Sequence, residues 1–178
     1  MKRGVYSAII IIISIILLSM LFLSFNKKTV EKMNLTSPVF ENNGNIPSKY
    51  SCDGKNVSPP LSISKVPENA KSLVLIVDDP DAPSKTWVHW ILWNIPKDTG
   101  IIEENKIPNG AVQGVNDFGK NNYDGPCPPS GIHRYFFKLY ALDSVLELSK
   151  NSGKQDTEEA MKKHIIAEAK LIGKYSRE

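Results

Sequence analysis

Two histidine-bearing segments and one acidic segment hold the residue types that could do chemistry. His89 follows Trp87 by two residues, and His133 precedes Tyr135 by two residues. Asp79 follows an apolar run at the start of a proline-containing stretch. Imidazole, phenol and backbone N–H groups donate hydrogen bonds to anions. If the strands that carry the two histidines share a sheet, the sequence predicts a pocket for a small anion.

The acidic segment and the histidines also have structural interpretations. Asp78, Asp79 and Asp81 place three acids within four positions, and the prolines among them stiffen the loop by fixing φ. Such a loop could hold carboxylates at a site, but aspartate and proline also form ordinary solvated turns. A lone histidine such as His89 is more often a satisfied core residue than a ligand.

Enzymatic chemistry has less support from these residues. Ser130 lies three residues from His133, but its Pro/Gly loop lacks the strand–turn–helix arrangement that presents an activated serine. His89, His133, Asp79 and Asp81 are types that bind zinc or iron, yet no His-x-x-x-His or Cys-x-x-Cys spacing accompanies them. A serine or metal-dependent hydrolase is therefore the least favoured function. We expect no catalytic residue, metal ligand or cofactor.

Short strands between turn residues must position these side chains. Four segments have the alternating or continuously apolar pattern of strands: residues 61–64, 73–77, 89–95 and 135–142. No helical spacer separates them, which favours an antiparallel sandwich or barrel over an α/β sheet.

Alternation along a strand predicts which side chains share a face. Four residues of the first histidine strand are placed together: Trp87, His89, Ile91 and Trp93. On the second histidine strand, His133, Tyr135 and Phe137 share one face, and Arg134 points to the other.

A C-terminal helix is predicted to pack on this sandwich. Asp156 and Glu159 resemble a capping box at its start, and Gly173 is a natural stop. Four apolar residues then fall on one helical face: Met161, Ile165, Ala169 and Ile172.

The N-terminal segment differs in composition from the rest of the chain. Of 178 residues with a net charge of +3, residues 1–28 hold four basic residues and no acid, which leaves 18 basic and 19 acidic residues in 29–178. This near-equal number of basic and acidic residues does not indicate a nucleic-acid-binding surface. Residues 5–25 hold no charge, and about 20 apolar residues can span a bilayer.

The predicted organisation follows from this segment. We expect residues 1–25 to be an uncleaved transmembrane anchor or, alternatively, a cleaved signal peptide. Residues 26–36 are expected to be a linker, and residues 37–178 a domain outside the cytoplasm, either tethered to the membrane or secreted.

The two cysteines of the chain both lie in the predicted exported domain. Cys52 and Cys127 occupy turn-rich segments. An even number of cysteines in an oxidising compartment is compatible with a disulfide. The alternative is two separate small apolar residues, and the sequence does not decide between them.

The combination of these motifs resembles the phosphatidylethanolamine-binding protein family, also called Raf kinase inhibitor-like proteins, and its prokaryotic branch in particular. The similarity covers about residues 37–177 and rests on the following segments: Cys52-Asp53-Gly54, Ser58-Pro59-Pro60-Leu61, Asp79-Pro80-Asp81-Ala82-Pro83, Trp87-x-His89, Gly125-Pro126-Cys127-Pro128-Pro129, Gly131-x-His133-Arg134-Tyr135 and Ala167-Glu168-Ala169-Lys170-Leu171-Ile172-Gly173.

This resemblance implies a mainly β fold, an antiparallel sandwich of that family's type with a C-terminal α-helix, here preceded by one transmembrane helix. It also implies a small pocket for phosphate, phosphorylethanolamine or similar anions. By motif position the pocket would be lined by Asp79, Asp81, Trp87, His89, Gly125, Pro126, His133 and Tyr135. Arg134 would be a structural residue paired with a carboxylate, for which Asp81 is a candidate.

The expected function is therefore binding rather than catalysis. The expected partner is a small phosphorylated or anionic ligand, such as a lipid headgroup, with no nucleic acid and with the membrane contacted through the N-terminal helix. The alternative is inhibition of a protein partner such as a protease or kinase. The short stretch before His89 and the early end of the chain depart from animal and plant members, which argues against kinase inhibition.

Overall fold

Two sheets stack face to face in the computed structural model, which describes residues 30–177. The elements are β1 (Glu31–Lys32), β2 (Asn34–Thr36), β3 (Gly44–Asn45), the 3₁₀ turn η1 (Ser48–Tyr50), β4 (Leu61–Ser64), β5 (Ser72–Asp79), β6 (Trp87–Ile95), β7 (Ile101–Ile102), β8 (Val112–Gln113), β9 (His133–Leu142), α2 (Lys154–Met161) and β10 (Ile165–Tyr175). The larger sheet has the order β1-β10-β9-β5-β6-β8, with β3 also paired to β10, and the smaller sheet has the order β2-β4-β7.

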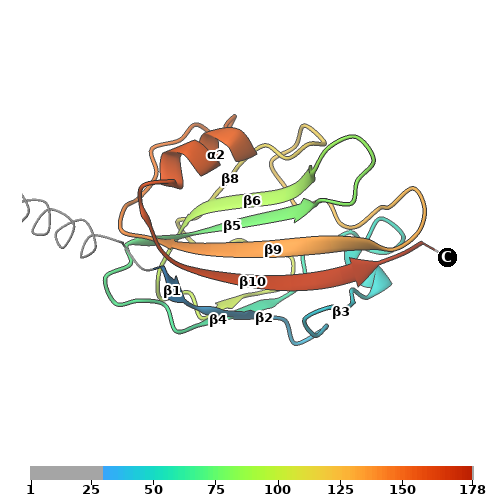
Figure 1. Cartoon of the computed structure of the whole chain (residues 1–178), viewed down its shortest axis with the longest axis horizontal. Helices are drawn as coiled ribbons and strands as arrows, with labels where there is room; N and C mark the ends of the chain where they lie inside the picture. Colours follow the sequence, from blue (N-terminus) through green and yellow to red (C-terminus); the bar gives the residue numbers. More distant parts are fainter. Residues whose placement is uncertain (1–29, 178) are drawn as a thin grey trace, which may run out of the picture.

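The four strands predicted from sequence are confirmed. They correspond to β4, β5, β6 and β9, of which the last three extend beyond the predicted ends. The pairs β5–β6, β5–β9 and β9–β10 are antiparallel, whereas β1 and β3 pair with β10 in parallel. The long strands β9 and β10 run side by side across the molecule (Figure 1).

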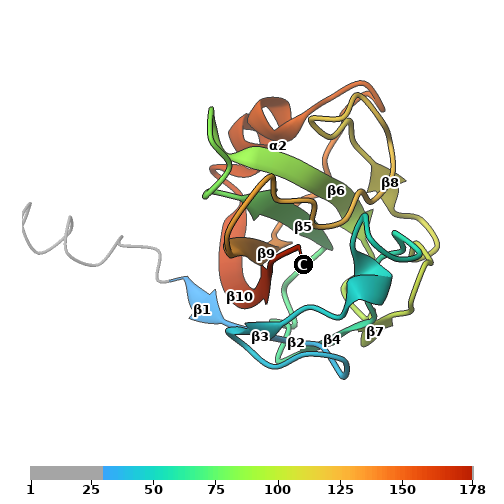
Figure 2. The ribbon, with the colours of Figure 1, turned by 90° about the vertical axis from the view of Figure 1, so that its right-hand side faces the viewer.

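The large sheet buries both of its faces. One face packs on the small sheet through a cluster that includes Leu75, Trp90 and Phe137. The opposite face packs under α2 through a second cluster that includes Ile76 and Trp93. Seen from the side, the small sheet and α2 lie on opposite sides of the large sheet (Figure 2). Strand β5 is buried along its whole length, which explains its continuous apolar run.

The predicted C-terminal helix is corrected by the structure. A helix forms only over Lys154–Met161, and Ile165–Tyr175 is the strand β10, paired with β9 from Ile165 opposite Leu142 to Tyr175 opposite His133. Alanine, glutamate and lysine favour helix in isolation, but the pairing with β9 outweighs that preference.

Two residues show the consequences of this correction. Asp156 was predicted to stand at the start of the capping box. It lies instead in the first turn of α2, where its carboxylate accepts a hydrogen bond from the backbone N–H of Gly153 at 3.0 Å. Gly173 does not end a helix. It lies within β10, where a Cβ atom would come within 2.4 Å of the Ile46 side chain.

The prediction of a transmembrane helix as part of the fold is also corrected. Within residues 30–177, no helix is both long and apolar enough to cross a membrane. The helix α2 has eight residues, which is about 12 Å against a hydrocarbon core of about 30 Å. Residues 1–25, where the helix was predicted, lie outside the described residues.

The predicted linker contributes to the domain. Residues 31–32 form β1 beside β10, and residues 34–36 form β2 beside β4. Met33 and Leu35 are buried in the core between the sheets. The alternation of Met33 and Leu35 with exposed neighbours is the strand signal within the segment predicted to be a linker.

Candidate functional site

Strand β5 ends in two adjacent carboxylates that point to opposite faces of the large sheet. Asp78 is fully buried, and its Oδ2 accepts hydrogen bonds from Lys138 at 2.7 Å and from Lys154 at 2.6 Å. Asp79 is 3% exposed and lies against His133. Alternation along the strand therefore assigns one acid to the helix face and the other to the sandwich face.

A β-bulge brings His89 to the same face as Asp79. Val77 is opposite Trp90 in the β5–β6 ladder, whereas Asp78 is opposite Val88, so His89 is the extra residue on β6. A bulge shifts the alternation of side chains by one position. For this reason Ile91 packs on the helix face, while His89 faces the sandwich.

The predicted grouping of Trp87, His89, Ile91 and Trp93 on one face is therefore wrong. Trp87 and His89 both contact Phe118, with ring centroids 5.5 Å apart in each pair. Trp93 lies on the helix face with Ile91. The predicted alternation on β9 is confirmed, because His133, Tyr135 and Phe137 are buried on one face and Arg134 is exposed on the other.

One ring nitrogen of His89 is committed to the protein backbone. Its Nδ1 lies 2.6 Å from the carbonyl oxygen of Asp124. A carbonyl can only accept, so Nδ1 carries the proton and the neutral ring keeps the lone pair of Nε2 free for another partner. Burial lowers the pKa of His89, which favours this neutral form.

His133 has the complementary arrangement. Its Nδ1 lies 2.7 Å from Oδ2 of Asp79, and the other oxygen of Asp79 accepts a hydrogen bond from the backbone N–H of Asp81 at 2.8 Å. The carboxylate thus orients the imidazole. The second nitrogen of the ring, Nε2, has no hydrogen-bond partner within residues 30–177.

Tyr135 shares the buried face of β9 with His133 and packs against His89. Its ring meets that of His89 edge to face at 5.2 Å. Its hydroxyl is buried and has no hydrogen-bond partner within residues 30–177. Burial raises the pKa of the phenol and keeps it neutral, with a smaller opposing influence from the backbone of Cys127. A buried hydroxyl without a partner costs about 1–3 kcal/mol, which a polar ligand could recover.

These side chains line a cavity of about 360 Å³, here called the histidine pocket. Its lining is Asp79, Ala82, Pro83, Ser84, Trp87, His89, Phe118, Cys127, Pro128, Pro129, His133 and Tyr135. The cavity therefore combines a few polar atoms with walls made largely of aromatic and proline side chains, a pattern common in small-ligand sites.

Three residues predicted for the site do not line the histidine pocket. Asp81 instead accepts two hydrogen bonds from the guanidinium of Arg134, at 2.8 and 2.7 Å, which is the structural pair suggested from the sequence. The backbone N–H of Gly125 donates to Asn56 Oδ1 at 2.7 Å, and a Cβ there would come within 2.1 Å of a backbone oxygen. The carbonyl of Pro126 accepts a hydrogen bond from Cys52 N–H.

Sequence reasoning missed part of the pocket wall. Phe118 reaches the pocket from a loop after β8, and no periodic pattern or motif marks it. Cys127, Pro128 and Pro129 belong to a motif of the family resemblance, from which only Gly125 and Pro126 are predicted to line the pocket. Their wall position could have been suspected, because that rigid segment leads directly into the strand that carries His133.

Cys52 and Cys127 form a disulfide, the pairing that the sequence left open. Their Cα atoms are 5.4 Å apart, and the bridge joins segments 75 residues apart in sequence. Since Cys127 lines the histidine pocket, the disulfide fastens one pocket wall to the loop that follows η1.

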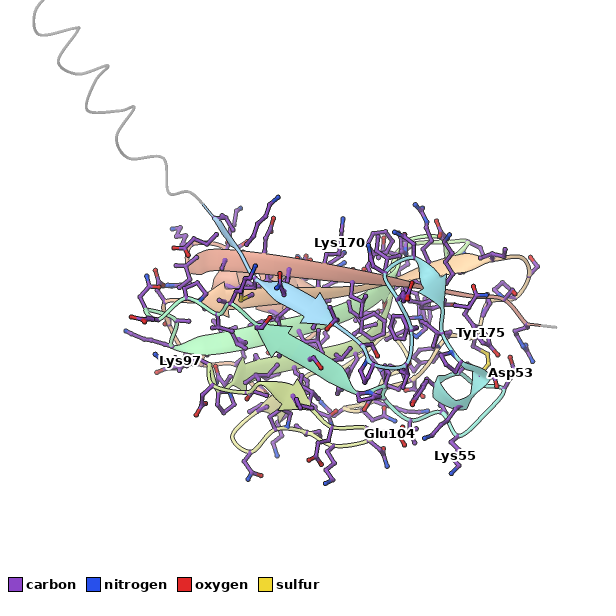
Figure 3. The ribbon with its side chains drawn as sticks, turned by 90° about the horizontal axis from the view of Figure 1, so that it is seen from below. Asp53, Lys55, Lys97, Glu104, Lys170 and Tyr175 are labelled. Atoms are coloured by element: carbon purple, nitrogen blue, oxygen red, sulfur yellow. A yellow bond between two sulfur atoms is a disulfide. The ribbon has the colours of Figure 1, made fainter. Side chains whose placement is uncertain are left out.

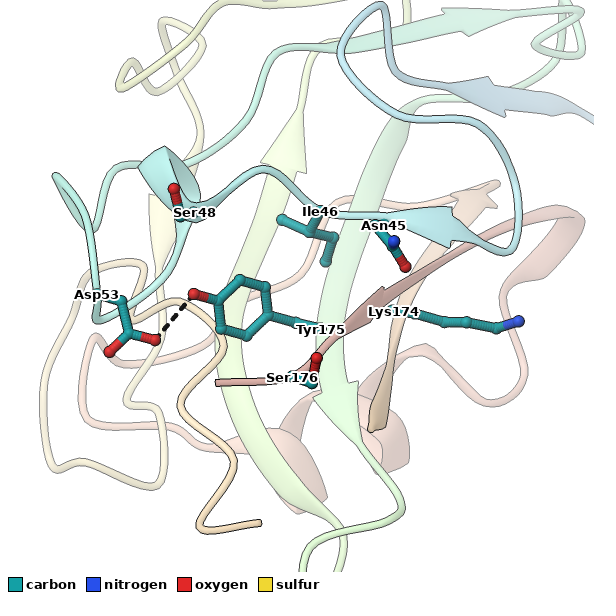
Figure 4. Close-up of a pocket in the computed structure, with 7 residues that line it drawn as sticks. All are labelled: Asn45, Ile46, Ser48, Asp53, Lys174, Tyr175 and Ser176. Atoms are coloured by element: carbon teal, nitrogen blue, oxygen red, sulfur yellow. Dashed lines mark hydrogen bonds between the residues drawn. The ribbon is translucent and has the colours of Figure 1, made fainter. Parts of the chain in front are cut away.

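A larger cavity of about 560 Å³ lies near the end of β10 (Figure 4). Its acidic residue is already bound: Tyr175 donates to Asp53 at 2.8 Å, and Arg177, which does not line the cavity, donates to the same carboxylate at 3.1 Å. Asp53 and Tyr175 lie together at one end of the molecule (Figure 3). Because these groups are already paired, this cavity is a weaker candidate than the histidine pocket. Within residues 30–177, no cluster of three or more histidine, cysteine or acidic residues could hold a metal ion.

Sequence comparison finds relatives that match most of the chain. The family model described as phosphatidylethanolamine-binding protein matches residues 36–176. A UPF0098 protein from Methanothermobacter thermautotrophicus is 58% identical over 150 residues, which cover 82% of this chain and 99% of that protein. One from Pyrococcus horikoshii is 49% identical over 156 residues, covering 83% of this chain and 79% of that protein.

Solved structures show the same architecture. A structure from Chlamydia trachomatis, described as a phosphatidylethanolamine-binding protein homolog, has a TM-score of 0.80 and 46% identity, and covers 83% of this chain and 99% of its own. Escherichia coli YbcL, described as a member of the mammalian PEBP family, has a TM-score of 0.78 and 33% identity over 83% of this chain and 99% of its own.

Proposed function

Since this chain belongs to the phosphatidylethanolamine-binding protein family, whose members are generally binding proteins, we propose that it binds a small phosphoryl or similar anionic group in the histidine pocket. One observation carries the proposal. Three polar atoms of residues that line the pocket have no hydrogen-bond partner within residues 30–177: Nε2 of His89, Nε2 of His133 and the buried hydroxyl of Tyr135.

The two imidazoles would contact an anion differently. His133, oriented by Asp79, can donate from Nε2 when it is charged. His89 is held neutral by burial, so its Nε2 accepts, and it would receive the proton of a hydrogen phosphate or take up a proton itself. The Tyr135 hydroxyl can donate or accept. This set favours a protonatable oxyanion such as phosphate or a phosphomonoester.

The walls of the pocket limit the ligand and its affinity. Trp87, Phe118 and the prolines offer apolar surface beside the polar atoms, which suits a phosphoryl group with a short organic substituent. Few ligand atoms would be in contact, so we expect a dissociation constant in the high micromolar to millimolar range, since each atom contributes at most about 1.5 kcal/mol.

Titration of residues 30–178 with phosphate and with O-phosphorylethanolamine tests the proposal. The match to the Methanothermobacter relative spans 150 residues and 99% of that protein, so the relative consists almost entirely of this domain. This supports the use of the fragment. Tryptophan fluorescence is the readout, because Trp87, one of the three tryptophans, lines the pocket. We expect saturable binding that is stronger at pH 6 than at pH 7.5, because histidines gain charge as the pH falls.

Two alanine variants separate pocket binding from unspecific binding. His133→Ala is expected to weaken binding at least about tenfold, the loss of a charge-assisted hydrogen bond. His164→Ala is the matched control, because His164 pairs with Asp143 outside the pocket. No saturable signal at about 50 mM ligand, well beyond the expected range, or equal effects of the two variants, would refute the proposal.

A further inference from the structure

Asn116 is a buried residue that lies just behind the histidine pocket without lining it. Its side-chain nitrogen donates to Oδ2 of Asp124 at 2.9 Å, to the carbonyl of Asn122 at 3.0 Å and to the carbonyl of His89 at 3.3 Å. Its side-chain oxygen accepts from the backbone N–H groups of Phe118 and Lys120, each at 3.0 Å. The amide therefore uses both donor hydrogens and both acceptor lone pairs.

The side-chain N–H groups of Asn116 bind both His89 and the residue that accepts its Nδ1–H, Asp124. Asp124 accepts the Nδ1–H of His89 through its carbonyl at 2.6 Å and returns a hydrogen bond from its N–H to the carbonyl of His89 at 3.1 Å. Asn116 binds the carboxylate of Asp124 and the same carbonyl of His89. It thus ties together the two residues whose mutual hydrogen bond selects the His89 tautomer.

The side-chain oxygen of Asn116 binds the turn that carries Phe118, a residue of the pocket wall. The turn that carries Phe118 bends back through Gly119, whose φ of 73° suits glycine, and the backbone N–H of Gly119 donates to the carbonyl of Asn116 at 3.0 Å. The Phe118 ring then contacts both Trp87 and His89 at 5.5 Å. One side chain therefore fixes the turn that places this ring.

We propose that Asn116 is the positioning residue of the histidine pocket. It holds His89 as the Nδ1–H tautomer with Nε2 free for a ligand, and it holds Phe118 as the wall beside that nitrogen. The inference concerning ligand affinity rests on the proposed anion binding, whereas the inference concerning the tautomer does not.

Two variants remove the donor half of the amide, and only one of them also removes the acceptor half. Asn116→Asp keeps an oxygen that can accept from Phe118 and Lys120, but it sets a second carboxylate against Asp124 and removes the donor to His89. Asn116→Ala removes both halves. The control is Asn94→Ala, because Asn94 is a partly buried asparagine whose side-chain amide likewise exchanges hydrogen bonds with backbone, here that of Leu146, away from the pocket.

The readouts are the tautomer of His89, from ¹⁵N NMR of the imidazole, and phosphate affinity of residues 30–178. Both Asn116 variants are expected to mix the His89 tautomers and to weaken phosphate binding about tenfold, the loss of one or two buried hydrogen bonds. Asn94→Ala is expected to lower the melting temperature while it leaves both readouts unchanged.

The outcomes are distinct. If both Asn116 variants keep the pure Nδ1–H tautomer of His89, the positioning role is refuted, whatever happens to affinity. If the wild type shows no phosphate binding, the proposed function fails, and the tautomer result still decides the role of Asn116. If neither variant folds, the side-chain amide NMR signals of Asn116 and Asn94 in the wild type provide the test. The Asn116 signal should shift when phosphate is added, and the Asn94 signal should not. Equal behaviour of the two signals would overturn the proposal.

Discussion

Asp78 and Asp79 are neighbours at the end of one strand and both are buried, but their basic partners differ. Asp78 lies on the helix face between two amines, Lys138 and Lys154. Asp79 lies on the sandwich face against one imidazole, that of His133. An amine keeps its charge near neutral pH, whereas an imidazole can lose it and has a second nitrogen to offer.

This difference separates a structural carboxylate from one that serves a site. Lys154 belongs to α2 and Lys138 to β9, so Asp78 fastens the helix to the sheet. Of the two ring nitrogens of His133, Asp79 binds only Nδ1 and leaves Nε2, the nitrogen proposed to contact a ligand, uncommitted. Adjacent residues of the same type thus have different roles because the strand turns them to different faces.

The largest expected effect comes from removing the charge of Asp78. Asp78→Asn removes the buried counter-ion that Lys138 and Lys154 share and leaves Lys154 only the more distant Glu158, at 3.7 Å. We therefore expect the free energy of unfolding to fall by about 3 kcal/mol. Asp79→Asn should cost about 1 kcal/mol, because an asparagine side-chain oxygen can still accept the hydrogen bond from Nδ1 of His133. Urea denaturation of both variants measures the contrast. Equal losses would contradict the assignment of separate roles.

A smaller effect is expected from the pH dependence of His89. Burial lowers its pKa below the ordinary 6.5, so the unfolded chain binds a proton more readily than the folded one. The resulting stability is present above about pH 6.5 and is lost as the pH falls below it. Urea midpoints at pH 7.5 and 5.5, in buffers without phosphate, should fall less in His89→Asn than in the wild type. An unchanged pH slope in the variant would show that His89 does not titrate in this way.

The smallest effect is expected for the exposed pair of Asp81 and Arg134. The guanidinium lowers the pKa of Asp81 to about 2 from an ordinary 3.8, so the pair stabilises the fold above about pH 4 and loses that effect as the pH falls toward 2. Asp81→Asn should shift the unfolding midpoint slightly at pH 7 and not at all near pH 2, since solvent screens the pair. A shift as large as that of Asp78→Asn would mean that exposure does not weaken this pair.

The sequence predicted most of the β core, because its strands are apolar runs bounded by turn residues. β10 was missed because Ala167, Glu168 and Lys170 favour helix locally, and its pairing with β9 is a long-range contact. The face of His89 was partly mistaken because a bulge depends on how β5 and β6 are paired, which no single strand shows. Motif similarity identified His133 and Tyr135, but Phe118 and Asn116 lie in a loop without a recognisable pattern.

The histidine side chains offer the most direct test of the central claim, that the Asp79 face of the sheet is a ligand site. The chain has three histidines, of which His89 and His133 line the pocket, while His164 follows α2 at the other end of β9, about 30 Å away by strand rise. Phosphate can be titrated into residues 30–178 while all three imidazoles are followed by NMR. The account predicts saturable shifts of His89 and His133 with one common dissociation constant and no shift of His164. Unchanged signals for His89 and His133, or an equal shift of His164, would contradict it.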